Sequence, residues 1–373
     1  MRFTILALLA WSAALASTSA EELTQLCKIG QPAVVQQPVA EADRAVWQGH
    51  IEHLYWAGDD ILVTATLGGL VRCHTTADGR ELWSKPLGGE IRPMTGDAIH
   101  SVTGPHSADG NLWSLGADHV IRELSLSDGR ELRRFTREQL ASLLKKDFVL
   151  PGHMAWLRDT KRVFIATYGD GYGLHGFVLD IAPFRPAGEA ATDGFLRSAE
   201  VHASGRYLTT IGNGRIRIWS FDEHKQVYEF ASGDALDTID APFMSNAQFN
   251  GKQTLVYTID NSWATGQAFV QSINQTKADA TFNSRHGHVV MDCDFAHGRI
   301  ALTGTERHVT VVDLQGNVLL EKRRATADRN AAIRFSPSGR RLAVGSWDNT
   351  ARVFKLPVTP AQRPIGPVVD APP

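Results

Sequence analysis

The chain has 373 residues, of which 43% are apolar and 21% are charged, a composition typical of a globular protein. Its formal net charge of −2 gives no electrostatic case for binding nucleic acid or an anionic membrane surface. The three cysteines, Cys27, Cys73 and Cys293, allow at most one disulfide within the chain, and the sequence does not indicate which two would pair.

The first 20 residues have the pattern of a secretory signal peptide. Arg2 supplies a positive charge, residues 5–16 (ILALLAWSAALA) form an apolar run, and small residues follow. This run is too short to span a bilayer. We therefore expect a soluble protein that is exported through a cleaved signal peptide, most simply to a bacterial periplasm, with cleavage after Ala16 or Ala20.

From residue 50 onward the chain repeats an order of short β-prone segments separated by tight turns. The clearest copy is AAIRFSPSGRRLAVGSWDNTARVFKL, in which SPSG and WDN are the turns between three strands. Three strands of this length cannot bury two faces alone, so the copies must stack on one another. The seven predicted repeats are 50–84, 91–135, 152–185, 195–230, 244–282, 288–323 and 330–356.

Two segments depart from the repeat. Residues 136–148 (TREQLASLLKKDF) combine good helix formers with a capping box at Thr136 and Gln139, which predicts a short inserted helix. Residues 357–373 are rich in proline and are expected to be extended or disordered.

The repeats resemble those of the WD-repeat β-propeller family. Asp348 lies where that family has its structural turn aspartate, and Phe354 replaces the signature tryptophan. Trp219 occupies the signature position of the fourth repeat. Gly-His dipeptides precede first strands elsewhere, at His50, His153 and His288.

This resemblance implies an all-β fold, a seven-bladed β-propeller of four-stranded antiparallel blades. The last repeat lacks a fourth strand, and the β-branched residues of 26–39 are predicted to supply it. The ring would then be closed by an N-terminal strand, which removes the exposed sheet edges of an open array.

In this family, the loops between blades and the loops between second and third strands share one face. That face surrounds the mouth of the central channel and is the usual binding surface. Aromatic and arginine side chains dominate binding hot spots, although a long hairpin with scattered surface residues would look similar. The predicted binding residues on this face are Arg92, Tyr168, Asp170, Tyr172, His175, Asn261, Trp263, Arg307, His308, Arg329 and Trp347.

A metal site at 285–297 (RHGHVVMDCDFAH) is disfavoured. The candidate ligands alternate between the two faces of a predicted strand and lie at both of its ends. Their spacing matches none of the usual zinc patterns. We expect neither a metal nor a cofactor.

The leading hypothesis for function is a non-catalytic platform for a protein partner in the cell envelope, since the chain contains none of the common catalytic motifs. The alternative is a propeller enzyme or cofactor-handling protein that uses Asp170, His175, Arg307 and His308 at the channel mouth. The ends of the first two repeats, ADGRELW and SDGRELRRF, resemble the blade ends of quinone-type propellers. A quinone cofactor is nevertheless disfavoured, because one of these two ends alone retains the terminal tryptophan, at Trp83, and because vicinal cysteines are absent. A scaffold held by its proline-rich tail is a third possibility.

Overall fold

The computed structural model describes most of the chain from Glu21 to Pro357. The described residues are 21–30, 49–87, 99–104, 110–116, 118–147, 149–157, 161–168, 174–191, 198–202, 204–212, 214–231, 243–260, 266–275, 277–284, 287 and 289–357. The predicted signal peptide, residues 358–373 of the proline-rich tail and residues 31–39 of the predicted closing segment lie outside them.

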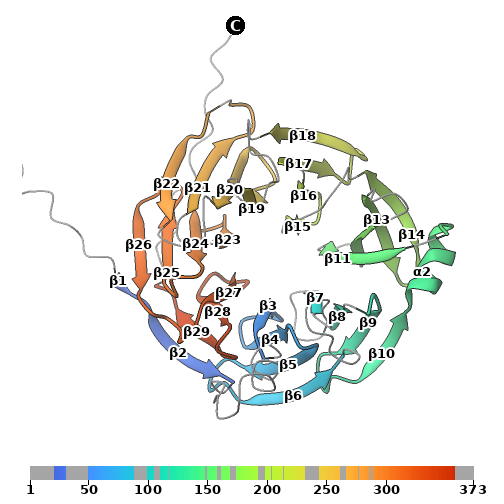
Figure 1. The fold of residues 1–373 in the computed structure, drawn as a ribbon, viewed down its shortest axis with the longest axis horizontal. Coiled ribbons are helices and arrows are strands. Elements are labelled where there is room, and N and C mark those ends of the chain that lie inside the picture. The colour runs from blue at the N-terminus through green and yellow to red at the C-terminus, as the bar shows by residue number, and fades with distance from the viewer. Residues whose placement is uncertain are drawn as a thin grey trace, which may run out of the picture.

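Seven sheets, each with four antiparallel strands, are arranged as blades around a central channel, as the repeats predict, and one of them carries a fifth strand (Figure 1). In blades 1 to 3 the strands follow one another in sequence from the channel outward. Blade 1 contains β3 (Ile51–Trp56), β4 (Ile61–Thr66), β5 (Leu70–Thr75) and β6 (Glu81–Pro86). Blade 2 contains β7 (Ile99–Thr103), β8 (Asn111–Gly116), β9 (Ile121–Ser125) and β10 (Glu131–Phe135). Blade 3 contains β11 (Leu150–Leu157), β12 (Arg162–Tyr168), β13 (Leu174–Ile181) and β14 (Phe184–Ala191).

Blades 4 and 5 repeat this order, and blades 6 and 7 recruit strands from the N-terminus. Blade 4 contains β15 (Ser198–Val201), β16 (Tyr207–Gly212), β17 (Arg215–Ser220) and β18 (Lys225–Ala231). Blade 5 contains β19 (Phe243–Phe249), β20 (Thr254–Asp260), β21 (Gly266–Ser272) and β22 (Ala280–Ser284). Blade 6 contains β23 (Val290–Asp294), β24 (Arg299–Thr303), β25 (Val309–Asp313), β26 (Val318–Lys322) and the added β1 (Glu21–Glu22). Blade 7 contains β27 (Asn330–Phe335), β28 (Arg341–Ser346), β29 (Ala351–Lys355) and β2 (Thr24–Ile29).

Helix α2 (Arg137–Leu144) lies at the rim between blades 2 and 3, within the segment where the sequence predicts an insert. Thr136 and Gln139 form the capping box at its start, and Leu140 and Leu144 are its buried residues. No helix in the described ranges combines the length and hydropathy needed to cross a bilayer.

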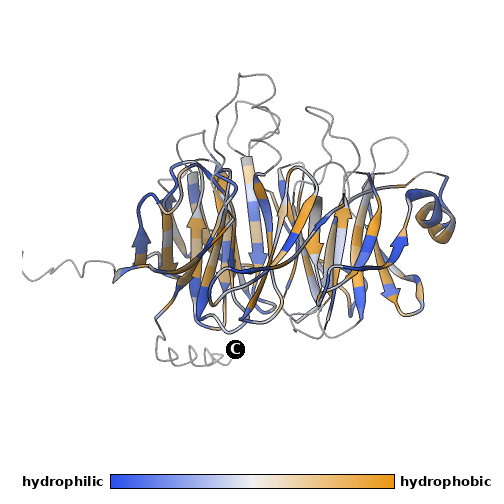
Figure 2. Ribbon diagram, turned by 90° about the horizontal axis from the view of Figure 1, so that it is seen from below, coloured by the Kyte–Doolittle hydropathy of each residue, from blue (hydrophilic) through white to orange (hydrophobic). Residues whose placement is uncertain are grey.

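The hydrophobic core is divided among the gaps between blades, because each blade must bury both faces against its neighbours. One such layer joins Val71 and Trp83 of blade 1 to Leu112 and Leu124 of blade 2. The side view in Figure 2 shows apolar and hydrophilic residues interleaved along the strands.

The N-terminal strand closes the ring, as predicted from the sequence. Strand β2 pairs antiparallel with β29, placing Cys27 opposite Val353. It begins at Thr24, two residues before the segment in which we expected it. The preceding strand β1, which the sequence did not indicate, pairs parallel with β26. Leu23, between the two strands, is 2% exposed in a core shared by blades 6 and 7.

We call residues 21–29 the clasp, because they join blades 6 and 7 to each other. Substituting Leu23 by alanine should lower the free energy of unfolding by about 2–5 kcal/mol, the usual cost of deleting a buried leucine side chain. Leu26 in the same clasp is 41% exposed, so Leu26→Ala is the matched control and should change the free energy by less than about 0.5 kcal/mol. Urea denaturation of the two variants measures both changes in the free energy of unfolding. Equal changes would contradict the conclusion that the buried Leu23 holds the clasp in the core of blades 6 and 7.

Candidate functional site

The structure places several of the predicted binding residues together where blade 7 meets blades 6 and 1. Trp347 follows β28, Arg329 precedes β27, and Arg307 lies in the turn between β24 and β25. By the alternation of the strands, these turns share one face of the ring. Five of the predicted binding residues lie outside the described ranges: Arg92, Asp170, Tyr172, Asn261 and Trp263. The predicted signature histidine His288 also lies outside them.

Trp347 is held by three neighbours. The guanidinium carbon of Arg329 lies 3.4 Å from the centroid of the indole ring. The imidazole of His50 stacks on the same indole with centroids 4.5 Å apart and an interplanar angle of 14°. The indole N–H donates to Glu52 Oε1 at 2.7 Å. We call His50, Glu52, Arg329 and Trp347 the Trp347 cluster.

The cluster bridges the two blades on either side of the ring closure. His50 and Glu52 belong to the start of blade 1, whereas Arg329 and Trp347 belong to blade 7. The backbone N–H of Trp347 also donates to the Arg329 carbonyl at 3.0 Å. A partly buried tryptophan is thus fixed in one orientation by ring stacking, a cation–π contact and a hydrogen bond.

Burial sets the charge states in the cluster. It lowers the pKa of His50 to about 4; Asp328 opposes this effect and Arg329 adds to it. Burial also raises the pKa of Glu52, although the indole hydrogen bond and Arg329 both act in the opposite direction. The pKa of Arg329 is lowered, again mainly by burial. Near neutral pH the histidine is therefore uncharged and presents a neutral ring to Trp347.

Asp348 fixes the turn that carries Trp347. Its Oδ1 accepts the backbone N–H of Thr350 at 2.9 Å, and its Oδ2 accepts the backbone N–H of Ala327 at 2.8 Å. The carboxylate is 7% exposed, so these bonds are formed away from bulk water. Asp348 thus ties the turn after β28 to the segment before Arg329. This is a structural role of the kind predicted for Asp348 from the sequence.

Arg307 is anchored to the same segment. Its backbone is left-handed, with φ of 60°, and its Nη1 donates to the Ala327 carbonyl at 2.9 Å. His308 is partly buried, and its carbonyl accepts the Thr303 hydroxyl at 2.7 Å.

The remaining predicted residues are spread over other blades. His175 is exposed in β13 of blade 3, and of Tyr168 the structure describes the backbone, which pairs with Leu174. His153 lies in β11 opposite Ala166, and Trp219 is partly buried in β17. His175 therefore belongs to a different blade from Arg307 and His308, the polar candidates of the enzyme hypothesis.

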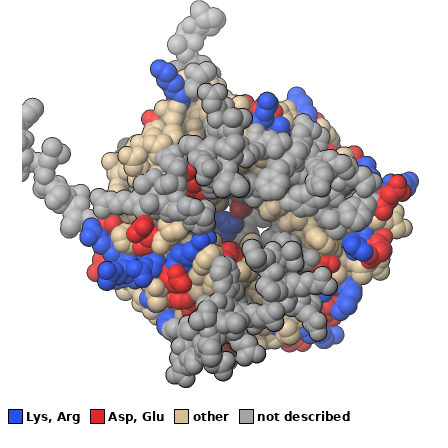
Figure 3. Space-filling view, viewed as in Figure 1, with Lys and Arg blue, Asp and Glu red and all other residues tan. Residues whose placement is uncertain are grey.

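Inside the channel, an ion-pair chain that sequence reasoning missed connects the inner strands of blades 4 to 7. Arg334 Nη2 lies 2.6 Å from Glu200 Oε1 and its Nη1 lies 3.3 Å from Asp292 Oδ1. Gln248 Nε2 donates to Asp292 Oδ1 at 3.0 Å. Figure 3 shows charged atoms within the central opening. Because blade 4 lies across the ring from blade 7, the Glu200–Arg334 pair reaches over the channel.

The segment considered for metal binding is divided between two separate networks. Asp292 belongs to the channel chain, whereas Asp294 accepts from His297 and Arg299. Arg299, 3% exposed, also bonds to the Gly339 carbonyl of blade 7. Within the described residues, no group of three or more His, Cys, Asp or Glu side chains could hold a metal ion.

Comparison with known proteins identifies one repeat. The family model described as WD domain, G-beta repeat matches residues 331–355, the segment from β27 through β29. No curated protein matches the chain. The matched repeat and the seven blades together support a WD-repeat β-propeller.

The depressed pKa of His50 predicts a loss of stability in acid. The unfolded chain binds a proton to His50 below its ordinary pKa of 6.5, whereas the folded protein excludes it down to about pH 4. This contribution is thus fully present above pH 6.5 and is lost as the pH falls toward 4. It amounts to about 2–3 kcal/mol between pH 7.5 and pH 4.5.

The measurement is urea denaturation of the wild type and His50→Gln at both pH values. The variant can be less stable than the wild type at pH 7.5. Between pH 7.5 and pH 4.5, however, its free energy of unfolding should fall by less than that of the wild type, and the difference should be about this amount. The same pH dependence in both proteins would contradict a neutral, buried His50.

Proposed function

We propose that the chain is an exported, non-catalytic platform that binds a protein partner in the cell envelope through the face containing the Trp347 cluster. WD-repeat propellers commonly serve as platforms for protein interaction. The observation that carries the proposal is the fixed, partly exposed pair of Trp347 and Arg329, two residue types that dominate binding hot spots.

Pre-organisation is the physical reason for choosing this pair. Binding costs free energy when flexible side chains must be ordered, and the neighbours of Trp347 have already fixed its orientation. Glu52 and Asp328 are the carboxylates that act electrostatically on Arg329, and within the described residues no carboxylate lies at ion-pair distance from its guanidinium, which stacks on the indole. Its polar edge can therefore receive a carboxylate of the partner, an interaction that is favourable where water is excluded.

The proposed export rests on residues 1–20 and agrees with the position of the clasp. Strand β1 of the clasp consists of Glu21 and Glu22, and Leu23 is buried. Cleavage after Ala16 or after Ala20 would leave residues 21–29 intact. The mature protein could then form the ring closure after export.

The test begins with capture of partners by the mature protein, tagged at its C-terminus, from periplasmic and membrane extract. For a stoichiometric partner identified by mass spectrometry, Trp347→Ala and Arg329→Ala should each weaken binding by about 2 kcal/mol or more, roughly 30-fold in Kd. Calorimetry with the purified partner measures the change. Trp263→Ala, at a predicted residue outside the described ranges, extends the series.

Arg130→Ala is the matched control, because Arg130 is an exposed arginine in the turn between β9 and β10, on the opposite face. This variant should bind as the wild type does. Unchanged affinity in both cluster variants would remove the cluster from the interface. A bound small molecule in place of any protein partner would overturn the platform proposal.

A further inference from the structure

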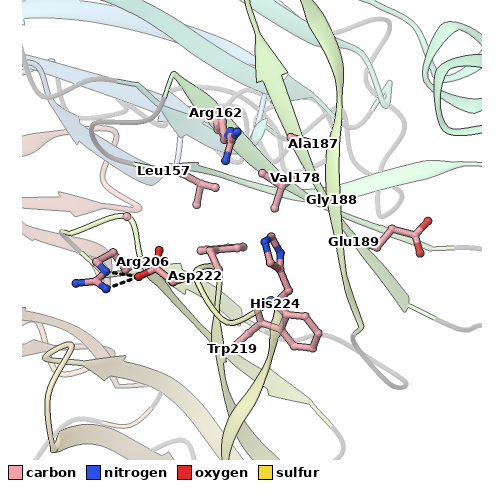
Figure 4. A pocket seen from close by; sticks show the side chains of 12 residues that line it. Leu157, Arg162, Val178, Ala187, Gly188, Glu189, Arg206, Trp219, Asp222 and His224 are labelled. Carbon is pink, nitrogen blue, oxygen red and sulfur yellow. Dashed lines mark hydrogen bonds and ion pairs between the residues drawn. The ribbon is translucent and has the colours of Figure 1, made fainter.

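Most arginines in the described part of the chain are paired with a carboxylate of the protein itself. At the cleft between blades 3 and 4, for example, Arg206 is paired with Asp222 (Figure 4). The arginines with no carboxylate of the described residues at ion-pair distance are Arg80, Arg307, Arg324, Arg329 and Arg340. Their guanidinium groups keep N–H donors that an outside carboxylate can accept.

Three of these arginines lie together at the junction of blades 6 and 7. Arg307 lies in the turn between β24 and β25, and Arg324 and Arg329 lie in the loop between β26 and β27. Arg80 and Arg340 lie in turns on the opposite face of the ring. Figure 3 shows Lys and Arg side chains gathered over blades 6 and 7. We call Arg307, Arg324 and Arg329 the open arginines.

The loop between β26 and β27 is held in place by hydrogen bonds to both neighbouring turns. The backbone N–H of Ala325 donates to the Arg307 carbonyl at 2.8 Å. The Ser346 hydroxyl donates to the carbonyls of Asp328 and Arg329 at 3.1 and 3.0 Å. Ala325 is 1% exposed, so the loop is packed into the ring on its inner side. Its outward side chains are therefore presented by a fixed backbone.

The open arginines are distributed along this loop. Arg324 lies near its start and Arg329 at its end, and the backbone between them can span at most about 18 Å. The side chain of Arg307 reaches the middle, where its Nη1 donates to the Ala327 carbonyl at 2.9 Å. Arg307 and Arg324 have left-handed backbones, with φ of 60° and 51°. Such conformations are uncommon for residues other than glycine and concentrate at functional sites.

Positive charge predominates in the two segments that carry the open arginines. The exposed carboxylates there are Glu306 and Asp328, and Asp328 Oδ1 already accepts the backbone N–H of Arg329 at 2.7 Å. Arg323, the other arginine of the loop, is 3.7 Å from a carboxylate oxygen of Glu321, which neutralises its charge. The surface is thus complementary to a segment that carries several negative charges.

We propose that the loop between β26 and β27 recognises an acidic segment of the protein partner, whose aspartate or glutamate side chains bind the open arginines. This inference rests on the proposed function and specifies the kind of segment that the face containing the Trp347 cluster binds. In an extended segment, side chains on one side are about 7 Å apart, so two or three alternate acidic residues match a loop of this length. Guanidinium groups suit this role because their planar fork binds a carboxylate through two hydrogen bonds.

The experiment is a titration of the mature protein with hexaglutamate, acetylated and amidated at its ends, followed by calorimetry and NMR. We expect saturable binding, with chemical-shift changes at Arg307, Arg324 and Trp347. Hexaglutamine, which has the same length and no charge, should not bind. Raising the ionic strength from about 0.01 M to about 0.15 M should weaken hexaglutamate binding, because the Debye length falls from about 30 Å to about 8 Å.

Variants test the location of the site. Arg307→Gln and Arg324→Gln should each weaken hexaglutamate binding by about threefold, and the double variant by about tenfold, as expected for exposed ion pairs. Arg323→Gln is the matched control, because this neighbouring arginine is already paired, and its affinity should stay within about twofold of the wild type. Glu306→Gln removes a competing carboxylate and should strengthen binding. Thermal unfolding confirms that each variant is folded.

Two results would overturn the inference: no saturable binding of hexaglutamate to the wild type, or equal affinity in the wild type and the folded double variant. Neither result depends on a captured partner, so the platform proposal would stand or fall by its own test. A partner whose affinity falls with Trp347→Ala but not with the double variant would likewise exclude the acidic segment and leave the platform in place.

Discussion

The pairing of β2 with β29 is the constraint on which the rest of the structure depends. A propeller blade buries its faces against two neighbours, so an open ring would expose one face at each end. Closure places residues near position 25 beside residues near position 354, and β1 extends the contact to blade 6. The bond from Trp347 to Glu52 and the hydrogen bond from Ser338 to Asp59 join the closed blade 7 to blade 1. The Trp347 cluster therefore exists because the ring is closed.

Between other blades, the same packing problem is solved with different residues. Arg299 of blade 6 bonds to the Gly339 carbonyl of blade 7, and Trp83 of blade 1 lies against Gly129 of blade 2. A repeated scaffold makes departures from the pattern informative, because the expected partner is visible in neighbouring repeats. Gly188 of blade 3 is such a departure, because the equivalent position of blade 1 carries Trp83.

The sequence was sufficient for the architecture because the repeats carry local turn signals. The turn after β28 and the role of Asp348 follow from residues close together in the chain, and the missing fourth strand of the last repeat implied closure from the N-terminus. Three residues of the candidate site were predicted from their places in the repeat: Arg329, Trp347 and Arg307. Glu52 was not, because its bond to Trp347 joins residues 295 positions apart. The Glu200–Arg334 pair was missed for the same reason, since it connects opposite blades.

Native-state hydrogen exchange tests the central claim, that the clasp and the ring form one cooperative unit. In the mature protein, the backbone amides of β2 that pair with β29 should exchange as slowly as those of β28 and β4, through global unfolding. Equal opening free energies across these strands are the predicted result. Exchange from β2 at an opening free energy several kcal/mol below that of β28 and β4 would show that the clasp detaches from an otherwise folded ring, and would contradict the account.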